Sequence, residues 1–421
     1  MKPTLSFSKL LSIAAIGGGL EMYDFVIYIY LVPYLAPLFF VSSSPFLSSM
    51  AAFAVFALGY FVRPLGGIIM GHFGDRIGRK KTFIASILLM SLPILGMGLL
   101  PTPHTIGLTA TVLFIALRML QGLAVGGEIP GAMAFVCEHA SPHRRGFASG
   151  SIYCGLNFGI CTAALVIAIL SSLFSTTQMA AFGWRIPFIL GAFLGFVAVY
   201  LRRKTDESPL FLAIQQQKKL EQVPLLSVLQ HPASLLRGIG VTALGATMVL
   251  LGFTYMSSFL TKELHYPHTI IWAVVAAVFI SSCLQIYCGA LSDRKGRIPL
   301  LKWASLLSLI LAFPIYFALS THTALGLTLG MLGFVLLAAV IIGIYPCFLI
   351  ELFPTSIRYS GYALSYNIGF AIFGGFAPLF SSYMIHTTGS TLSPALWLIL
   401  ASLLSFISLL GLKDQHLGSL T

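Results

Sequence analysis

The sequence GHFGDRIGR at residues 71–79 recurs as GALSDRKGR at residues 289–297. Both stretches read G-x-x-x-D-R-x-G-R, and each follows an apolar run long enough to cross a bilayer. A weaker echo places Glu138 shortly before Arg145 in one part of the chain, and Glu351 shortly before Arg358 in the other. Such a repeat predicts two pseudo-symmetric parallel halves related by an axis along the membrane normal.

The composition of the whole chain is that of a membrane protein. Of its 421 residues, 57% are hydrophobic and 9% are charged, and the mean hydropathy is +0.94. Soluble domains carry about 25% charged residues, which argues strongly against a soluble fold. Apolar runs of about 18 residues or more predict an all-α membrane protein with twelve transmembrane helices. The expected spans lie near residues 10–33, 46–71, 82–100, 107–137, 147–173, 184–201, 236–260, 270–291, 299–319, 323–350, 357–386 and 392–412.

The longest polar stretch separates the first six predicted spans from the last six. We therefore predict an N-terminal six-helix half at residues 1–201, a cytoplasmic linker at 202–235 and a C-terminal six-helix half at 236–421. The break between the ninth and tenth spans rests only on the short polar sequence STHT at residues 320–323.

The placement of lysine and arginine predicts the orientation of the protein. With both termini inside, Lys262 and Arg185 fall on the outer side, Arg63 and Arg118 fall within spans, and the other twenty of the 24 basic residues are cytoplasmic. The net charge of +12 then reflects the orientation of the protein in the membrane and does not indicate binding to nucleic acid. We expect a multi-pass protein of the bacterial cytoplasmic (inner) membrane, in contact with the lipid bilayer, without a nucleic-acid partner and functional as a monomer.

Several motifs resemble a known family. The two G-x-x-x-D-R-x-G-R loops resemble the signature loop of the major facilitator superfamily, and RMLQG at residues 118–122 resembles its second motif. Other features resemble the metabolite:proton symporter branch, which includes proline/betaine, α-ketoglutarate, citrate and shikimate carriers. They are EMYDF (21–25), RPLG (63–66), GGE (126–128), RRGF (144–147), GWRIPF (183–188), ESP (207–209), ELFPT (351–355) and FGG (373–375). The resemblance covers nearly the whole chain and implies a transporter that works by alternating access.

Five ionisable residues lie within predicted spans, all in the first half: Glu21, Asp24, Arg63, Arg118 and Glu128. A charge at the bilayer centre costs at least about 2.5–3.5 kcal/mol, so each of these residues is expected to have a structural or functional role that offsets this cost. Related sugar carriers pair an acid of the first span with the equivalent arginine, which implies a pair between Asp24 and Arg118. We predict that Asp24 carries the coupled proton and that its proton affinity varies with its distance to Arg118. A fixed ion pair that only joins two helices, and a proton-carrying role for Glu21, are the open alternatives.

Neutral polar groups of the second half complete the predicted substrate site. Tyr28 shares one face of the first span with Glu21 and Asp24, because the three are spaced i, i+3 and i+7. The candidate substrate-binding residues are Tyr28, Arg118, Gln121, Tyr255, Gln285, Tyr366 and Asn367.

Charged residues toward the cytoplasmic ends of the spans predict a gate. Arg63 and Glu128 would pair as an inner gate, or would only satisfy each other within the bundle. Asp75 of the signature loop would accept hydrogen bonds from a helix N-terminus across the interface between the halves. The other gating candidates are Arg76, Arg79, Glu138, Arg145, Asp293, Arg294, Arg297, Glu351 and Arg358. The alternative is a solvated basic loop that serves only for orientation.

The predicted function is proton-coupled import of a small organic metabolite, a zwitterionic osmolyte or amino acid such as betaine or proline. The alternatives are a symporter of organic acids or citrate-like chelators, an efflux antiporter and a receptor-like sensor. The six cysteines lie in apolar segments without CxxC or zinc-like spacing. No nucleophile–base pair or cofactor fingerprint stands out, so we expect no enzyme, metal or cofactor, and the partners are the small-molecule substrate and protons.

Overall fold

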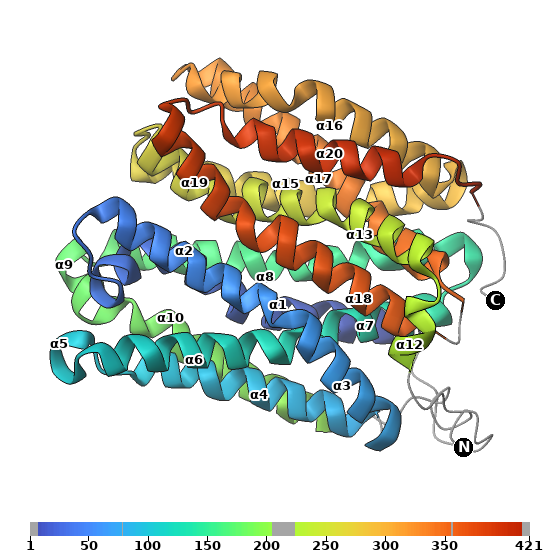
Figure 1. Ribbon diagram of the computed structural model, residues 1–421, viewed down its shortest axis with the longest axis horizontal. Helices are drawn as coiled ribbons and strands as arrows, with labels where there is room; N and C mark the ends of the chain where they lie inside the picture. Colours follow the sequence, from blue (N-terminus) through green and yellow to red (C-terminus); the bar gives the residue numbers. More distant parts are fainter. Residues whose placement is uncertain (1–6, 78, 204–223, 355–356, 415–421) are drawn as a thin grey trace.

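The computed structural model describes residues 7–77, 79–203, 224–354 and 357–414 (Figure 1). Within these ranges it does not describe the side chains of residues 10, 71–77, 79–84, 135, 201–203, 224–226 and 268. All regular structure in the described ranges is helical. The predicted all-α membrane protein is confirmed at this level.

The helices before residue 204, here called the N-terminal helices, are separated by short turns. They are α1 (Phe7–Phe39), α2 (Pro45–Phe61), α3 (Arg63–Ile77), α4 (Arg79–Leu99), α5 (Pro103–Ile106), α6 (Leu108–Val125), α7 (Glu128–His139), η1 (Pro142–Arg144), α8 (Arg145–Leu173), α9 (Thr176–Gln178), η2 (Met179–Gly183) and α10 (Arg185–Arg203).

The helices after residue 223, here called the C-terminal helices, include several π-helical turns. They are α12 (Pro224–Leu229), α13 (Pro232–Thr247), η3 (Met248–Tyr255), α14 (Met256–Ser258), η4 (Phe259–Glu263), η5 (His268–Ile270), α15 (Ile271–Lys295), α16 (Arg297–Ser320), α17 (Ala324–Leu352), α18 (Arg358–Gly369), η6 (Phe370–Gly375), α19 (Phe376–Thr388) and α20 (Pro394–Leu409). The break predicted at residues 320–323 is confirmed, and the Thr323 hydroxyl there accepts the Gly326 N–H at 3.0 Å and caps α17.

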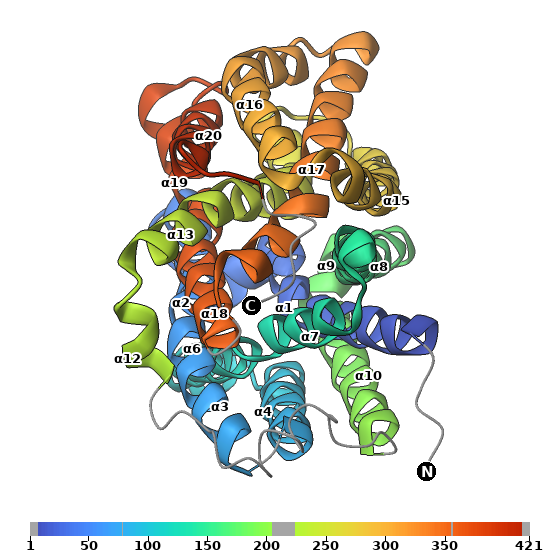
Figure 2. The same cartoon turned by 90° about the vertical axis from the view of Figure 1, so that its right-hand side faces the viewer.

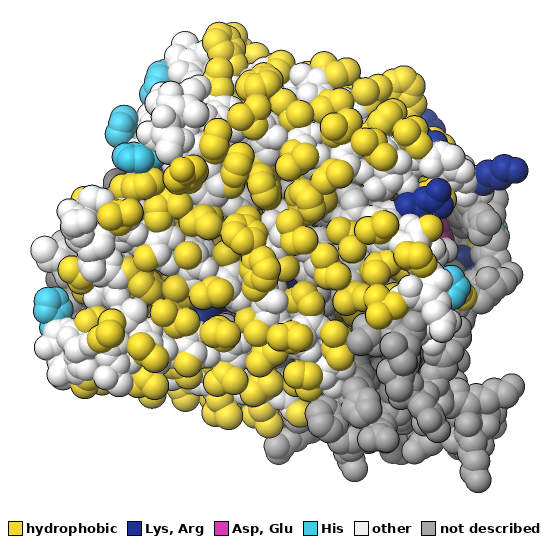
Figure 3. Space-filling view, viewed as in Figure 1, with side chains coloured by type: hydrophobic (Ala, Val, Ile, Leu, Met, Phe, Trp, Pro, Cys, Tyr) yellow, Lys and Arg dark blue, Asp and Glu magenta, His cyan; other side chains and the backbone are white. Residues whose placement is uncertain are grey.

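Many of these helices are long and apolar enough to cross a membrane. Nine stretches in the described part of the chain meet that requirement outright. A tenth candidate, Thr176–Gly183 with Arg185–Tyr200, is bent by 44°, and Ala85–Leu99 and Pro394–Leu409 are shorter apolar helices. Apolar side chains are spread widely over the face of the molecule shown in Figure 3, and most of the Lys and Arg visible there lie at the right-hand end of the view. The chain is therefore a multi-pass membrane protein.

The N-terminal and C-terminal helices pack along a broad interface. In Figure 2 most of the C-terminal helices lie above and most of the N-terminal helices below. The principal contacts across the interface join α8 to α15 and α17, α2 to η6 and α19, and α18 to α3 and α7. Glycines allow close approach within the bundle: a Cβ on Gly122 of α6 would collide with the backbone of Gly59 in α2.

Both ends of this interface are closed. At the end where α8 and α18 begin and α15 and α17 finish, called the basic end below, several arginines are buried against acidic residues. At the opposite end the Tyr30 hydroxyl donates to the Phe253 carbonyl at 2.7 Å, and the rings of Phe46 and His386 stack with centroids 3.7 Å apart. The N-terminal and C-terminal helices are therefore in contact at both ends of the interface within the described part of the chain.

Candidate functional site

Arg118 lies near the middle of the bundle and holds the backbone of α1. Its Nη1 donates to the Phe25 carbonyl at 3.0 Å and to the side chain of Gln121. Gln121 in turn donates through Nε2 to the Asp24 carbonyl at 2.9 Å. The expected Asp24–Arg118 ion pair is therefore not formed in this structure. Arg118 contacts the α1 backbone instead, because the Asp24 side chain points toward α10.

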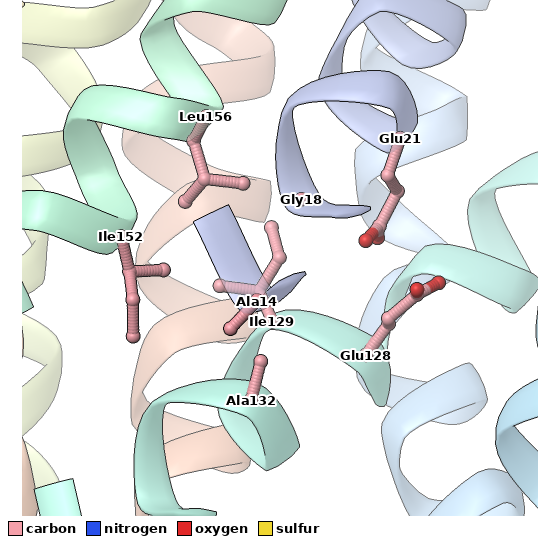
Figure 4. A pocket seen from close by; sticks show the side chains of 8 residues that line it. All are labelled: Ala14, Gly18, Glu21, Glu128, Ile129, Ala132, Ile152 and Leu156. Atoms are coloured by element: carbon pink, nitrogen blue, oxygen red, sulfur yellow. The ribbon is translucent and has the colours of Figure 1, made fainter. Parts of the chain in front are cut away.

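Asp24 lines a small cavity together with two other acids. Glu21, Asp24 and Glu128 share this cavity with Ser91, and a second cavity next to it is lined by Glu21 and Glu128 (Figure 4). Each has a water-accessible volume of about 10 Å³, near the lower limit for one water molecule. In Figure 4 the carboxyl groups of Glu21 and Glu128 point toward each other.

Arg63 is buried at the start of α3 and faces the C-terminal helices. Its Nε donates to Oδ1 of Asn367 at 3.2 Å, and Asn367 is fixed by donating to the Gly126 carbonyl at 2.6 Å and the Ala363 carbonyl at 2.9 Å. The expected Arg63–Glu128 pair is not formed, since Arg63 turns toward Asn367 while Glu128 lies in the acidic cavity.

Aromatic rings enclose both arginines. The Arg63 guanidinium carbon lies 5.0–5.5 Å from the ring centroids of Phe25, Tyr60, Tyr366 and Phe370. The Arg118 carbon lies 4.3–5.4 Å from those of Phe25, Tyr28 and Phe56. We call this group of rings and guanidinium groups the arginine–aromatic cluster.

Several guanidinium N–H groups of the cluster have no well-aligned hydrogen-bond acceptor in the described part of the chain. Nη1 and Nη2 of Arg63, and Nε and Nη2 of Arg118, meet no hydrogen-bond acceptor among the described residues. Both side chains have 0% exposure. A buried cation normally has a carboxylate partner, and arginine binds carboxylates through two parallel hydrogen bonds. The arrangement is therefore chemically suited to a carboxylate that comes from outside the chain.

The other candidate substrate residues divide into two groups. Tyr28 and Gln121 contact Arg118, and Tyr366 and Asn367 contact Arg63, so these four belong to the arginine–aromatic cluster. Gln285 and Tyr255 lie elsewhere. Gln285 accepts from Asn157 at 2.7 Å between α8 and α15, and the Tyr255 hydroxyl donates to Ser382 at 3.4 Å.

Sequence reasoning missed four rings of the cluster: Phe25, Phe56, Tyr60 and Phe370. Two of them carried a usable signal. Phe25 follows the buried Asp24 directly, and Tyr60 lies three residues before Arg63, one helical turn away. Phe370 comes from the C-terminal helices, and its position against Arg63 depends on how the two sets of helices pack.

The repeat motif of the C-terminal helices contacts the start of α8. The Asp293 carboxylate accepts the backbone N–H groups of Gly146 at 2.8 Å and Phe147 at 2.9 Å. It also pairs with Arg297 at 2.9 Å, and Arg297 pairs with Glu351 at 2.8 Å. This is the helix N-terminus contact that the sequence predicted for Asp75 in the other copy of the motif. The side chains of Asp75, Arg76 and Arg79 lie outside the described residues.

Two ion pairs cross the interface at the basic end. Arg145 lies 3.8 Å from Glu351, and Arg358 lies 3.3 Å from Glu138. Arg145 and Glu351 therefore join one network with Asp293 and Arg297, and Arg358 and Glu138 form a separate pair across the same end of the interface. Arg294 differs, because its side chain is exposed at the surface.

Comparison with known proteins agrees with this architecture. Residues 14–378 match the family model described as the Major Facilitator Superfamily. The chain is 32% identical to the glycine betaine/proline/ectoine/pipecolic acid transporter OusA of Dickeya dadantii and to the proline/betaine transporter of Salmonella typhimurium, each over 96% of this chain and 83% of the relative. Among solved structures, the proton:xylose symporter XylE bound to 6-bromo-6-deoxy-D-glucose matches with a TM-score of 0.78 at 16% identity, covering 98% of this chain and 97% of that one. The chain belongs to the Major Facilitator Superfamily of membrane transporters.

Proposed function

We propose that the protein imports a small carboxylate-bearing zwitterion, such as betaine or proline, together with protons. The supporting observation is the arginine–aromatic cluster, in which two buried arginines present N–H groups that meet no acceptor in the described part of the chain. A substrate carboxylate would accept from Arg63 or Arg118, and a substrate ammonium would lie against the tyrosine and phenylalanine rings.

The relatives support this class of substrate. The transporters of Dickeya dadantii and Salmonella typhimurium carry glycine betaine or proline in their names. Both compounds combine one carboxylate with one cationic nitrogen, the two features that the cluster would recognise.

The topology we propose for transport has twelve spans in two halves, at residues 1–201 and 236–421, joined by a linker at 202–235. The nine long apolar stretches, the bent pair and the two shorter apolar helices together supply this number. The basic end faces the cytoplasm of a bacterial inner membrane, because Lys and Arg gather there, and both termini are cytoplasmic. The protein functions as a monomer within the lipid bilayer.

The two ends of the interface would open alternately. The contacts of Asp293 with the start of α8 and the Arg145–Glu351 and Arg358–Glu138 pairs would break on opening toward the cytoplasm, and the Tyr30–Phe253 hydrogen bond on opening outward. Asp24 would load a proton in the outward-open state and release it in the inward-open state. The burial of several carboxylates in one cavity favours this uptake, since holding them all ionised together is costly.

A second substrate class has its own supporting observation. Two arginines share the ring of Phe25 and neither is paired with a carboxylate among the described residues, so a dicarboxylate could bind both at once. Organic acids such as α-ketoglutarate, and citrate-like chelators, are therefore the alternative cargo.

Uptake by the purified protein in liposomes tests the proposal. An inward proton gradient should drive accumulation of radiolabelled betaine or proline, and an excess of α-ketoglutarate or citrate should not compete. Arg63→Lys keeps the charge but removes the planar fork, so we expect KM to rise about 10–100-fold. The exposed Arg294→Lys is the matched control and should leave KM unchanged. Accumulation of the organic acids alone would replace the zwitterion with the second class, and an unchanged KM in Arg63→Lys would remove Arg63 from the site.

A further inference from the structure

We propose that a cluster of four buried tyrosines beside the arginine–aromatic cluster accepts hydrogen bonds from the cationic nitrogen of the substrate. The carrier would then prefer a nitrogen that bears N–H groups, as in proline, over the fully substituted nitrogen of betaine. The members, called the tyrosine cluster below, are Tyr153, Tyr345, Tyr362 and Tyr366. This inference rests on the proposed function, because it concerns which zwitterion the same site selects.

The four tyrosines come from three helices and meet inside the bundle. Tyr153 lies on α8, Tyr345 on α17, and Tyr362 and Tyr366 lie one turn apart on α18. The hydroxyls of Tyr153 and Tyr345 share a hydrogen bond of 2.6 Å, and the Tyr153 hydroxyl also lies close to those of Tyr362 and Tyr366. Each of the four side chains is at most 2% exposed. The cluster therefore joins an N-terminal helix to two C-terminal helices away from water.

Glycines bring the helices of the cluster together. A Cβ on Gly245 of α13 would lie 2.7 Å from the Tyr345 ring, so that ring occupies space that a side chain would otherwise fill. Cβ atoms on Gly150 of α8 and Gly343 of α17 would lie 2.5 and 2.6 Å from the same backbone oxygen, that of Gln285 in α15. Because α8 and α17 both approach α15 this closely, the tyrosines that follow these two glycines come within hydrogen-bonding distance of each other.

The tyrosine cluster has hydrogen-bonding capacity to spare. The hydroxyls of Tyr362 and Tyr366 have no well-aligned hydrogen-bond partner in the described part of the chain. Buried polar side chains in proteins normally have such a partner. A tyrosine hydroxyl can both donate and accept a hydrogen bond, so these two oxygens can serve a ligand.

Tyr366 connects the tyrosine cluster to the proposed carboxylate site. The centroid of its ring lies 5.4 Å from the Arg63 guanidinium carbon, while its hydroxyl lies close to that of Tyr153. The next residue, Asn367, accepts from Nε of Arg63 at 3.2 Å. In proline and betaine a single carbon or CH₂ group separates the carboxylate from the nitrogen. A substrate whose carboxylate binds Arg63 can therefore present its nitrogen to the tyrosine hydroxyls.

The chemistry of the neighbouring groups favours an N–H donor as the ligand of these hydroxyls. The two arginines can only donate hydrogen bonds. The side-chain oxygens of Gln121 and Asn367 already accept from Arg118 and Arg63. Any cationic nitrogen can lie against the ring faces, but only one that carries N–H groups can also donate to the tyrosine oxygens. The preference for N–H groups follows from this additional contact.

The test uses proline, N-methylproline and N,N-dimethylproline, which share a ring and a carboxylate and carry two, one and no N–H groups on the cationic nitrogen. Each compound competes with radiolabelled proline for uptake into liposomes under an inward proton gradient. For the wild-type protein we expect the inhibition constant of N,N-dimethylproline to exceed that of proline at least about tenfold, since two hydrogen bonds are lost. Tyr153→Phe keeps the ring and removes the central hydroxyl, so this ratio should fall at least about threefold.

Tyr359→Phe is the matched control. The Tyr359 hydroxyl also joins α18 to an N-terminal helix, donating to the Gly127 carbonyl at 2.6 Å, but it lies outside the tyrosine cluster. Its loss should shift the inhibition constants of all three compounds in equal proportion and keep the wild-type ratio. An equal fall of the ratio in both variants would attribute the effect to the helix interface and overturn the inference.

Two further results would overturn the inference and leave the proposed function intact. One is a wild-type ratio in folded Tyr153→Phe protein, and the other is wild-type protein that binds the three compounds equally. If Tyr153→Phe does not fold, Tyr366→Phe decides by the same criterion, because its hydroxyl has no well-aligned partner to lose. Wild-type protein that accumulates neither proline nor betaine would instead overturn the proposed function, and this inference with it.

Discussion

Asp293→Asn should weaken the closed state of the basic end. The Asp293 carboxylate accepts two N–H groups at the start of the 29-residue helix α8, from Gly146 and Phe147. In asparagine an NH₂ group replaces one of the two carboxylate oxygens. One of the two hydrogen bonds to α8 is therefore lost, and the NH₂ donor then faces a backbone N–H donor. Each hydrogen bond to a charged group contributes about 1.5–3 kcal/mol, and a carboxylate at a helix N-terminus adds about 0.3–2 kcal/mol. Arg297 lies on the same side of the interface as Asp293, so that ion pair survives opening and is not counted.

The closed state should therefore lose about 3 kcal/mol relative to the state open at the basic end. Since 1.4 kcal/mol is a factor of ten, the open population rises roughly 100-fold. Two native cysteines report this directly, because Cys137 and Cys347 are both 0% exposed. Cys347 lies 3.3 Å from Nε of Arg297, within the gating network. The assay is the rate of alkylation by N-ethylmaleimide in a background that replaces the other four cysteines by alanine.

A neighbouring acid supplies the control. Asp414 accepts the Ile298 N–H at 2.8 Å at the start of α16, a contact that does not cross to the N-terminal helices. Asp414→Asn should leave the alkylation rate unchanged. An unchanged rate in Asp293→Asn, with thermal unfolding like that of the parent protein, would refute the conclusion that Asp293 holds this end shut.

Two other predictions concern the centre of the bundle. Asp24→Asn keeps the side-chain shape and removes the ionisable group. Substrate accumulation in liposomes should therefore fall from about tenfold per unit of pH gradient to none, while substrate exchange continues. Loss of exchange in a folded variant would favour a structural role for Asp24. Gly19→Ala should destabilise the protein by about 1–3 kcal/mol, because the new Cβ meets a backbone carbonyl of α8. Gly18→Ala meets only the end of a flexible side chain, so it should melt near the wild-type temperature in detergent; equal melting of both variants would contradict this.

The fold was predictable from the sequence because a bilayer constrains a chain strongly. Helices must satisfy their own backbone groups in lipid, so apolar runs give the spans directly. The break at Thr323 and the pairing of Asp293 with Arg297 also follow from local rules, the latter because the two are one helical turn apart. The domain boundary within residues 202–235 stays a prediction, since residues 204–223 lie outside the described chain.

The pairing of the buried charges was not predictable in the same way. Counting residues along a helix gives the depth of Asp24 and Arg118 but not the direction in which each side chain points around its helix. That direction depends on packing: Gly191 admits the Asp24 carboxyl toward α10, while Gln121 holds Arg118 against the α1 backbone. The pairing of Arg63 with Asn367 depends in the same way on how α18 lies against α3.

The acidic cavity is built only from helices that precede residue 204. Substitutions in α13 to α20 would therefore leave every residue that lines this cavity unchanged. The same division makes hybrid carriers practical. A chimera that joins residues 1–203 to the C-terminal helices of a relative would keep Glu21, Asp24 and Glu128 from this parent, and would take the groups that contact Arg63 from the other.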